Sequence, residues 1–221
     1  MESLPLKIDF HVHTIYSHDG LISFKQLARQ IRKTGLDGVA ITDHDTIKGA
    51  LTFLEKSKSY DFLIIPGVEI TARGAHIVAL NVYEDISAGL SIEETVELVH
   101  EAGGLAVLAH PITIHKGVKR LLRGEIFDAV EVINASSFPF LFSVSRSKAF
   151  AKKFGLVEVA GSDAHYFEEV GSAYTLVNSN LSIESVIEAI RKNAVTPCGG
   201  RIPFGIRLKR EALVLKRKFS Q

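Results

Sequence analysis

Short apolar runs alternate with longer helical patterns along the chain, and this alternation most limits what the chain can fold into. Most runs show little polar alternation, as expected of strands covered on both faces. Strands that alternate with helices predict βα units around a parallel sheet. The seven predicted strands are "KIDFHVH", "DGVAITDH", "FLIIPGVEI", "AHIVALNV", "GLAVLAHP", "AVEVIN" and "LVEVAGSDAH".

The segments between these runs carry helix signals. Ser23 and Gln26 form a predicted capping box at the start of a helix that Gly35 ends. Ser91 and Glu94 repeat this pattern. Further helices are predicted around 46–58, 142–154 and 182–193.

Acids and histidines sit at the carboxyl ends of most predicted strands, as in "KIDFHVHT", "AITDHD", "IIPGVEI", "VLAHP" and "VAGSDAH". An open sheet collects ligands mainly at one switch point, whereas residues from nearly every strand can converge only if the strands close into a ring. We therefore expect an α/β barrel, somewhat irregular, with about seven strands. At 221 residues the chain is predicted to form a single domain, 1–221, with a basic carboxyl tail about 206–221.

Composition excludes several classes of protein. Lys and Arg number 26 against 25 Asp and Glu, so a net charge of +1 gives no global attraction to nucleic acid. The single cysteine, Cys198, excludes an internal disulfide framework. The segment "MESLPLKIDF" lacks the pattern of an export signal, and no apolar run approaches the roughly 18–20 residues that span a bilayer. We expect a cytoplasmic protein with no membrane contact, and no protein partner can be assigned.

The acids and histidines at the strand ends predict a metal site. Side chains two apart on a strand point the same way, so His11 and His13 project together, as do Asp163 and His165. Burying many ionisable groups at one barrel mouth is costly without a compensating cation. Imidazoles and carboxylates without thiolates suit Zn, Mn or Fe, and such sites typically activate water and clamp phosphoryl oxygens. The expected reaction is hydrolysis.

Five motifs in order, "HVHT…DG", "ITDHD", "GVEI", "AHP" and "GSDAH", resemble those of the polymerase and histidinol phosphatase (PHP) family of metal-dependent phosphoesterases. The resemblance spans roughly residues 8–200 and is to a compact stand-alone member. It implies a distorted (β/α)7 TIM-like barrel with two to three divalent metal ions (Mn, Zn or Fe) at its carboxyl end.

The resemblance also implies which residues hold the ions. Family members have the acid or histidine after H-x-H at one of two offsets; His18 and Asp19 occupy both here, and Asp19 is preferred. Glu69, Asp163 and His165 are expected to be catalytic. The first ion would be held by His11, His13, Glu69 and Asp163, the second by Glu69, His76 and His110, and the third by Asp19, His44 and His165.

Substrate contacts are expected from residues outside this ligand set. Asn134 is expected to face the site, as a substrate contact or a support for a ligand, whereas Glu131 on the same strand is expected to face elsewhere. The basic tail is expected to be a solvated helix, with an RNA-contacting arm as the alternative. The predicted phosphate-binding cations are Lys116, Arg146 and Arg201.

The implied enzyme is a metal-dependent phosphoric ester hydrolase that acts through a metal-activated water. The segment "GSDAHYFEEVGSAYTLV" is most similar to the branch that acts on nucleotides or RNA 5′ ends, including nucleoside 3′,5′-bisphosphate phosphatases. Those relatives generally carry an inserted segment between the Glu69 and His110 regions, which this chain lacks. A histidinol-phosphate-type phosphatase, a non-catalytic RNA-binding scaffold and a polymerase-associated module therefore stay open as alternatives.

Overall fold

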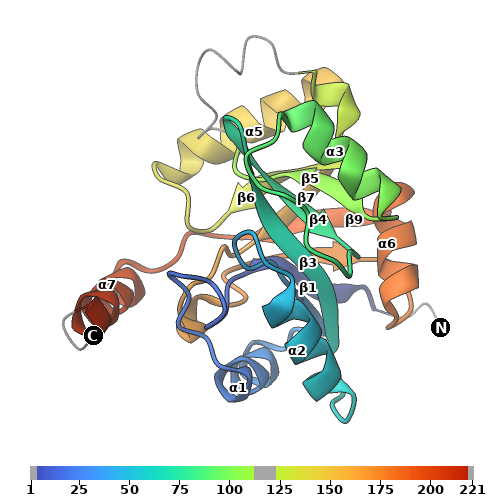
Figure 1. Ribbon diagram of the computed structural model, residues 1–221. Coiled ribbons are helices and arrows are strands. Elements are labelled where there is room, and N and C mark those ends of the chain that lie inside the picture. Colours follow the sequence, from blue (N-terminus) through green and yellow to red (C-terminus); the bar gives the residue numbers. More distant parts are fainter. Residues whose placement is uncertain (1–3, 112–122, 219–221) are drawn as a thin grey trace.

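All seven predicted strands form, and they make a barrel-shaped sheet with helices around it (Figure 1). The computed structural model describes residues 4–111 and 123–218 of the chain. In those ranges the sheet has nine strands. They are β1 (Leu6–Val12), β2 (Gly38–Ile41), β3 (Leu63–Ala72), β4 (Ala75–Leu80), β5 (Leu105–Leu108), β6 (Ala129–Asn134), β7 (Val157–Gly161), β8 (Ala173–Val177) and β9 (Val195–Gly199).

The barrel closes where the end of β7 meets the end of β1. The strand order is β7-β6-β5-β4-β3-β2-β1-β8-β9, so β7 and β1 are not neighbours in the continuous ladder. The backbone N–H of Asp163 nevertheless donates to His11 O at 2.8 Å, and that of His13 donates to Ala164 O at 2.8 Å. These bonds join the first and seventh strands at their carboxyl ends, which confirms the predicted irregular barrel.

Two details of the predicted sheet are wrong. Strand β4 runs antiparallel to β3 and β5, because only Arg73 and Gly74 connect β3 to β4, and so short a link allows a hairpin but no crossover. Strands β8 and β9 raise the number above seven and pair antiparallel, β8 with the first half of β1 and β9 with β8. Strand β9 contains Pro197, which weakens a strand prediction but is tolerated on an edge strand.

The predicted helices also form. Both capping boxes are present, at Ser23 with Gln26 and at Ser91 with Glu94. Among the helices in the described ranges, none has the length and apolar character needed to cross a bilayer. The helices are α1 (Phe24–Thr34), α2 (Lys48–Ser57), α3 (Ile92–Glu101), α5 (Phe140–Phe154), α6 (Ile183–Arg191) and α7 (Phe204–Lys218), with short 3-10 turns at Gly124–Ile126 and Phe167–Glu169.

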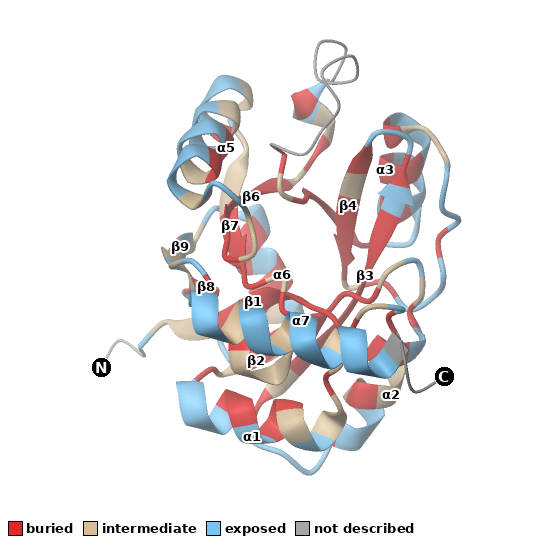
Figure 2. Ribbon diagram, turned by 90° about the vertical axis from the view of Figure 1, so that its left-hand side faces the viewer, coloured by how far each residue is buried: buried red, intermediate tan, exposed pale blue. Residues whose placement is uncertain are grey.

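Buried apolar residues lie on both faces of the strands, while the outer faces of the helices are exposed (Figure 2). One cluster includes Leu27 and Ile31 of α1 and Phe53 of α2, packed against the sheet. A second cluster joins β1, β5 and β7 to Ile187 and Ile190 of α6. Burial on both faces explains why the strands are nearly continuous apolar runs.

Close backbone approach at the barrel closure requires a glycine at position 161. A Cβ on Gly161 would lie 2.4 Å from His11 Cβ and 2.9 Å from both His11 N and Glu131 Oε1. No side chain fits there, because buried backbone and a strand side chain surround the position.

We expect Gly161→Ala to lower the free energy of unfolding by about 1–3 kcal/mol, since a methyl group would force β1 and β7 apart. Gly205→Ala is the matched control, because a Cβ at Gly205 in α7 meets nothing within 4 Å. Denaturant unfolding checks both variants, and equal stability of Gly161→Ala and Gly205→Ala would contradict the close approach.

Candidate metal centre

The carboxylate of Glu69 lies at the centre of a ring of histidines. Glu69 is on β3 and almost fully buried, with 1% of its side chain exposed. Its Oε2 lies 3.2 Å from each of His11 Nε2, His13 Nε2 and His44 Nδ1, and its Oε1 lies 2.8 Å from His76 Nδ1 and 3.0 Å from His110 Nε2. Five imidazoles, two from β1 and its end, one from β4 and one each from the segments after β2 and β5, thus converge on one carboxylate.

Asp163 adds a second buried carboxylate beside the histidines of β1. Its Oδ1 lies 3.2 Å from His13 Nε2 and 3.7 Å from His11 Nε2. Both Nε2 atoms are buried and form no hydrogen bond, although a carboxylate oxygen lies 3.2 Å from each of them. Buried nitrogen atoms rarely stay without a partner. A cation between these imidazoles and carboxylates would satisfy all four groups.

Asp19 lies between His44 and the last histidine of the cluster, His165. Its Oδ2 lies 3.1 Å from His165 Nε2 and 3.5 Å from His44 Nε2, and its Oδ1 is buried without a partner. The neighbouring His18 points outward, with 78% of its side chain exposed against 35% for Asp19. Of the two offsets that the sequence left open, the structure places Asp19 in the cluster.

Local backbone geometry aims two of these side chains. His110 and Asp163 have φ angles of 27° and 53°, a region that residues with a side chain seldom occupy. Strain of this kind persists where the surrounding structure enforces it, and it is most frequent at functional sites. Pro111 follows His110, shortly after β5 ends at Leu108.

The ionisable groups strongly perturb one another. Burial by itself lowers the pKa of His11, but the carboxylates of Glu131, Glu69 and Asp163 outweigh it and raise that pKa well above its usual range. Burial by itself raises the pKa values of Glu69 and Asp163, but the surrounding histidines, above all His11, hold both well below their usual range. Burial by itself lowers the pKa of His165, but Asp19 and Asp163 outweigh it and raise that pKa to about 9.

These shifts mean that protons on the histidines balance the charge of the ionised carboxylates. A divalent ion would replace those protons, because a ligating imidazole must be neutral and a ligating carboxylate ionised. Each of four overlapping groups of three or four residues offers ligand atoms within 4.8 Å of one another. Together they contain all nine predicted ligands: His11, His13, Asp19, His44, Glu69, His76, His110, Asp163 and His165. The donor set therefore fits metal ions.

The expectation that Glu131 faces elsewhere is wrong. Its Oε1 lies 3.1 Å from His11 Nδ1, and its Oε2 accepts from His110 N at 3.0 Å and from Asn134 Nδ2 at 2.9 Å. In a regular strand, residues three apart face opposite sides. The register of β6 against β7 shifts between Glu131 and Ile133, so Glu131 and Asn134 both reach the cluster. Asn134 Nδ2 also donates to Asp163 Oδ2 at 3.1 Å.

The predicted phosphate-binding cations have different positions. Lys116 lies outside the described residues. Arg146 is exposed on α5 and makes no contact with the cluster that the described ranges show. Arg201 lines a pocket together with Arg207 of α7. Arg207 was not among the predicted site residues, because its only signal was a place in a basic tail that composition could not distinguish from a solvated helix.

Comparisons with known proteins agree with this geometry. A family model described as PHP-associated matches residues 144–195. An uncharacterized protein of Methanocaldococcus jannaschii, MJ1587, is 35% identical over 144 residues, which are 59% of this chain and 82% of that protein. A 5′-3′ exoribonuclease of Haemophilus influenzae is 38% identical over 79 residues, 34% of this chain and 28% of that enzyme.

The fold matches a solved structure from Bacteroides vulgatus, a two-domain protein that contains a predicted PHP-like metal-dependent phosphoesterase. The TM-score is 0.72 at 17% identity, over 88% of this chain. This chain spans 65% of that protein's length, so the likeness concerns the shared barrel. The nine converging acids and histidines, the barrel and the matched segments lead to one conclusion: the chain belongs to the PHP family of metal-dependent phosphoesterases.

Proposed function

We propose that the protein hydrolyses phosphate esters of nucleotides or RNA 5′ ends, with two or three divalent ions (Mn, Zn or Fe) held by the nine clustered residues. The contacts of Glu69 are the observation that carries this proposal. Its Oε2 faces the histidines of β1, and its Oε1 faces His76 and His110. A carboxylate with imidazoles on both oxygens is suited to bridging two ions.

Divalent ions at such a site supply an activated water and positive charge for the phosphoryl oxygens. The chain's own residues orient the donors. Glu131 lies against His11 Nδ1, which keeps the proton of that ring on Nδ1 and leaves Nε2 for the centre. His165 Nδ1 donates to the backbone oxygen of Asp163 at 3.0 Å, which in the same way leaves His165 Nε2 facing Asp19.

Asp163 and Glu169 are each held in place by a second polar side chain. Asn134 Nδ2 donates to Asp163 Oδ2, so Asp163 Oδ1 is the oxygen that faces His11 and His13. Glu169 accepts from His165 N and is itself paired with Arg210 at 3.2 Å, which fixes the loop that follows β7. Preorganised donors of this kind reduce the rearrangement needed during reaction.

Two arguments support a nucleotide or RNA end as substrate. The sequence is similar to a 5′-3′ exoribonuclease over 79 residues, which are 28% of that enzyme. Basic residues of α7 also lie next to the site, where Arg207 and Arg210 contact the loops that follow β6 and β7. Turnover of a panel of esters would separate this substrate class from a histidinol-phosphate-type phosphatase.

Manganese should raise the melting temperature of the metal-free protein by about 5–10 °C at a hundredfold excess over Kd, because the ion binds only the folded cluster. His13→Asn should lose most of this rise. His100→Asn is the control, since His100 pairs with Asp128 outside the cluster. Differential scanning calorimetry measures the shift, and an equal rise in both variants would exclude this cluster as the binding site.

Glu69→Gln should lower kcat with a phosphate ester by at least about 1,000-fold, because the neutral amide cannot balance the charge of two ions. Glu97→Gln, on the exposed face of α3, should keep full activity. Initial rates with added manganese provide the measurement, together with metal content by mass spectrometry. Near wild-type rates in Glu69→Gln, or absence of both metal and turnover in the wild type, would reject the proposed function.

Glu131→Gln should weaken manganese binding by about 10- to 100-fold, as loss of a partner behind a metal ligand does. Glu158→Gln on the adjacent strand β7 is the control, because the described structure shows no contact of Glu158 with the cluster. Metal titration by calorimetry compares the two affinities. An unchanged affinity in Glu131→Gln, with the fold intact, would show that His11 does not need this carboxylate.

A further inference from the structure

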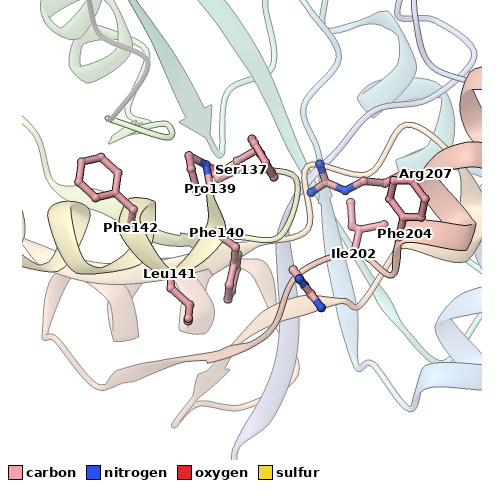
Figure 3. A pocket seen from close by; sticks show the side chains of 10 residues that line it. Ser137, Pro139, Phe140, Leu141, Phe142, Ile202, Phe204 and Arg207 are labelled. Carbon is pink, nitrogen blue, oxygen red and sulfur yellow. The ribbon is translucent and has the colours of Figure 1, made fainter.

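A pocket of about 880 Å³ opens between the start of α5 and the start of α7. Figure 3 shows Phe204 and Arg207 on one side of this pocket and Pro139, Phe140 and Leu141 on the other. The residues that the metal centre uses do not line it, so the described structure contains a second hollow whose role the ligand cluster does not explain.

One short segment connects the pocket to the metal centre. At its start, Asn134 donates to Asp163 of the cluster. At its end, Ser137 lines the pocket, and its N–H donates to Asn134 O at 3.2 Å. Between them, Ala135 O accepts from Arg207 Nη2 at 2.9 Å. Asn134, Ala135 and Ser136 thus connect a metal-site carboxylate to Ser137 of the pocket wall, so the pocket lies beside the metal centre.

Two guanidinium groups of the pocket have no acidic partner among the described residues. Arg201 and Arg207 both line it, and neither forms an ion pair within the described ranges. On the same helix, by contrast, Lys209 and Arg210 pair with Glu168 and Glu169. Burial and the neighbouring charge of Arg210 lower the pKa of Arg207, whereas Glu169 and Asp163 of the metal centre oppose this shift, so the charge of Asp163 acts on this side chain. An anionic ligand would provide the ion-pair partner that both arginines lack among the described residues.

The other walls of the pocket are apolar and unusually exposed. Phe138 is 85% exposed, Leu141 80% and Phe204 74%. Large apolar side chains that lie exposed together mark binding sites. Aromatic rings bind planar rings by stacking, and the arginine fork matches a phosphate group. The pocket therefore offers aromatic side chains to a planar ring and guanidinium groups to an anion.

We infer that this pocket binds the leaving-group side of the substrate, with Arg201 and Arg207 on a second phosphate and the exposed phenylalanines against an aromatic base. This inference rests on the proposed function, because the first phosphate must lie at the metal centre. A free nucleotide with two phosphates and a 5′-phosphorylated RNA end share this chemistry. In the RNA, the next phosphodiester supplies the second charge.

Four substrates separate these contributions, each assayed with manganese. Glycerol 3-phosphate has neither ring nor second charge, 4-nitrophenyl phosphate has only a ring, and adenosine 3′,5′-bisphosphate has both. A 5′-phosphorylated oligoribonucleotide tests the RNA source. The variants are Arg201→Gln, Arg207→Gln and Phe204→Ala, with Lys209→Gln as the control on the same helix.

The arginine variants should lower kcat/KM for the bisphosphate by roughly 10- to 100-fold, as expected for a lost charged hydrogen bond. Arg201→Gln should leave kcat/KM for glycerol 3-phosphate unchanged. Arg207→Gln also loses the bond to Ala135 O, so it should lower kcat/KM for glycerol 3-phosphate by a clearly smaller factor than for the bisphosphate. Phe204→Ala should lower kcat/KM for both aromatic small molecules by about 3- to 10-fold. The substrate whose kcat/KM the arginine variants lower more, the bisphosphate or the oligoribonucleotide, identifies whether the pocket takes a free nucleotide or an RNA end. Lys209→Gln should change none of these values.

Equal losses for all substrates would assign Arg207 a purely structural role, and unchanged kcat/KM values in the pocket variants would exclude the pocket from substrate binding. Both results overturn the inference while turnover of glycerol 3-phosphate leaves the proposed function standing. If no ester is hydrolysed, the proposed function fails. Binding measured by calorimetry then tests whether the pocket holds a ligand. Binding of adenosine bisphosphate that Arg207→Gln weakens supports the inference, and equal affinity or no binding overturns it.

Discussion

The burial of one carboxylate among imidazoles constrains the rest of this structure. Glu69 is removed from water, and an isolated buried carboxylate would be strongly destabilising. Its stability depends on positive charge brought from several strands at once, either as protons on the histidines or as metal ions. Only a ring of strands can deliver those groups to one point. The histidines that contact it are His11, His13, His44, His76 and His110.

The closure of the barrel between β1 and β7 is also stabilised by hydrogen bonds to Asp9. Asp9 is fully buried and accepts from the backbone N–H groups of His11, Ser162 and Gly171. Burial, which these bonds only partly offset, raises the pKa of Asp9 to about 6. Asp9 thus connects β1 to both ends of the segment 162–171, which contains Asp163 and His165. The same closure that positions His11 therefore also positions Asp163, and small residues such as Gly161 are required where the two strands approach.

The sequence was sufficient for the features that depend on local patterns. Strand ends rich in acids and histidines predicted seven of the nine clustered residues, and the resemblance to the PHP family added Asp19 and His76. Capping boxes predicted the starts of α1 and α3. Prediction from the sequence failed where a local irregularity sets the direction of a side chain or allows an unexpected strand. The register shift in β6 turns Glu131 toward the site, and an edge strand tolerates Pro197. Neither a bulge nor an edge position leaves a periodic signal in the sequence.

Helix α7 is the clearest case of tertiary structure overriding composition. Its basic residues predict a solvated helix, and its outward face is indeed exposed (Figure 2). Yet Arg207, Arg210 and Arg217 bond to three different loops at the mouth of the barrel, at Ala135, Glu169 and Gly20. The partners follow β6, β7 and β1, which are the strands that supply Asn134, Asp163 and His11. A helix tied to these three loops holds the metal centre and the neighbouring pocket in one arrangement, so the tail is part of the site's architecture.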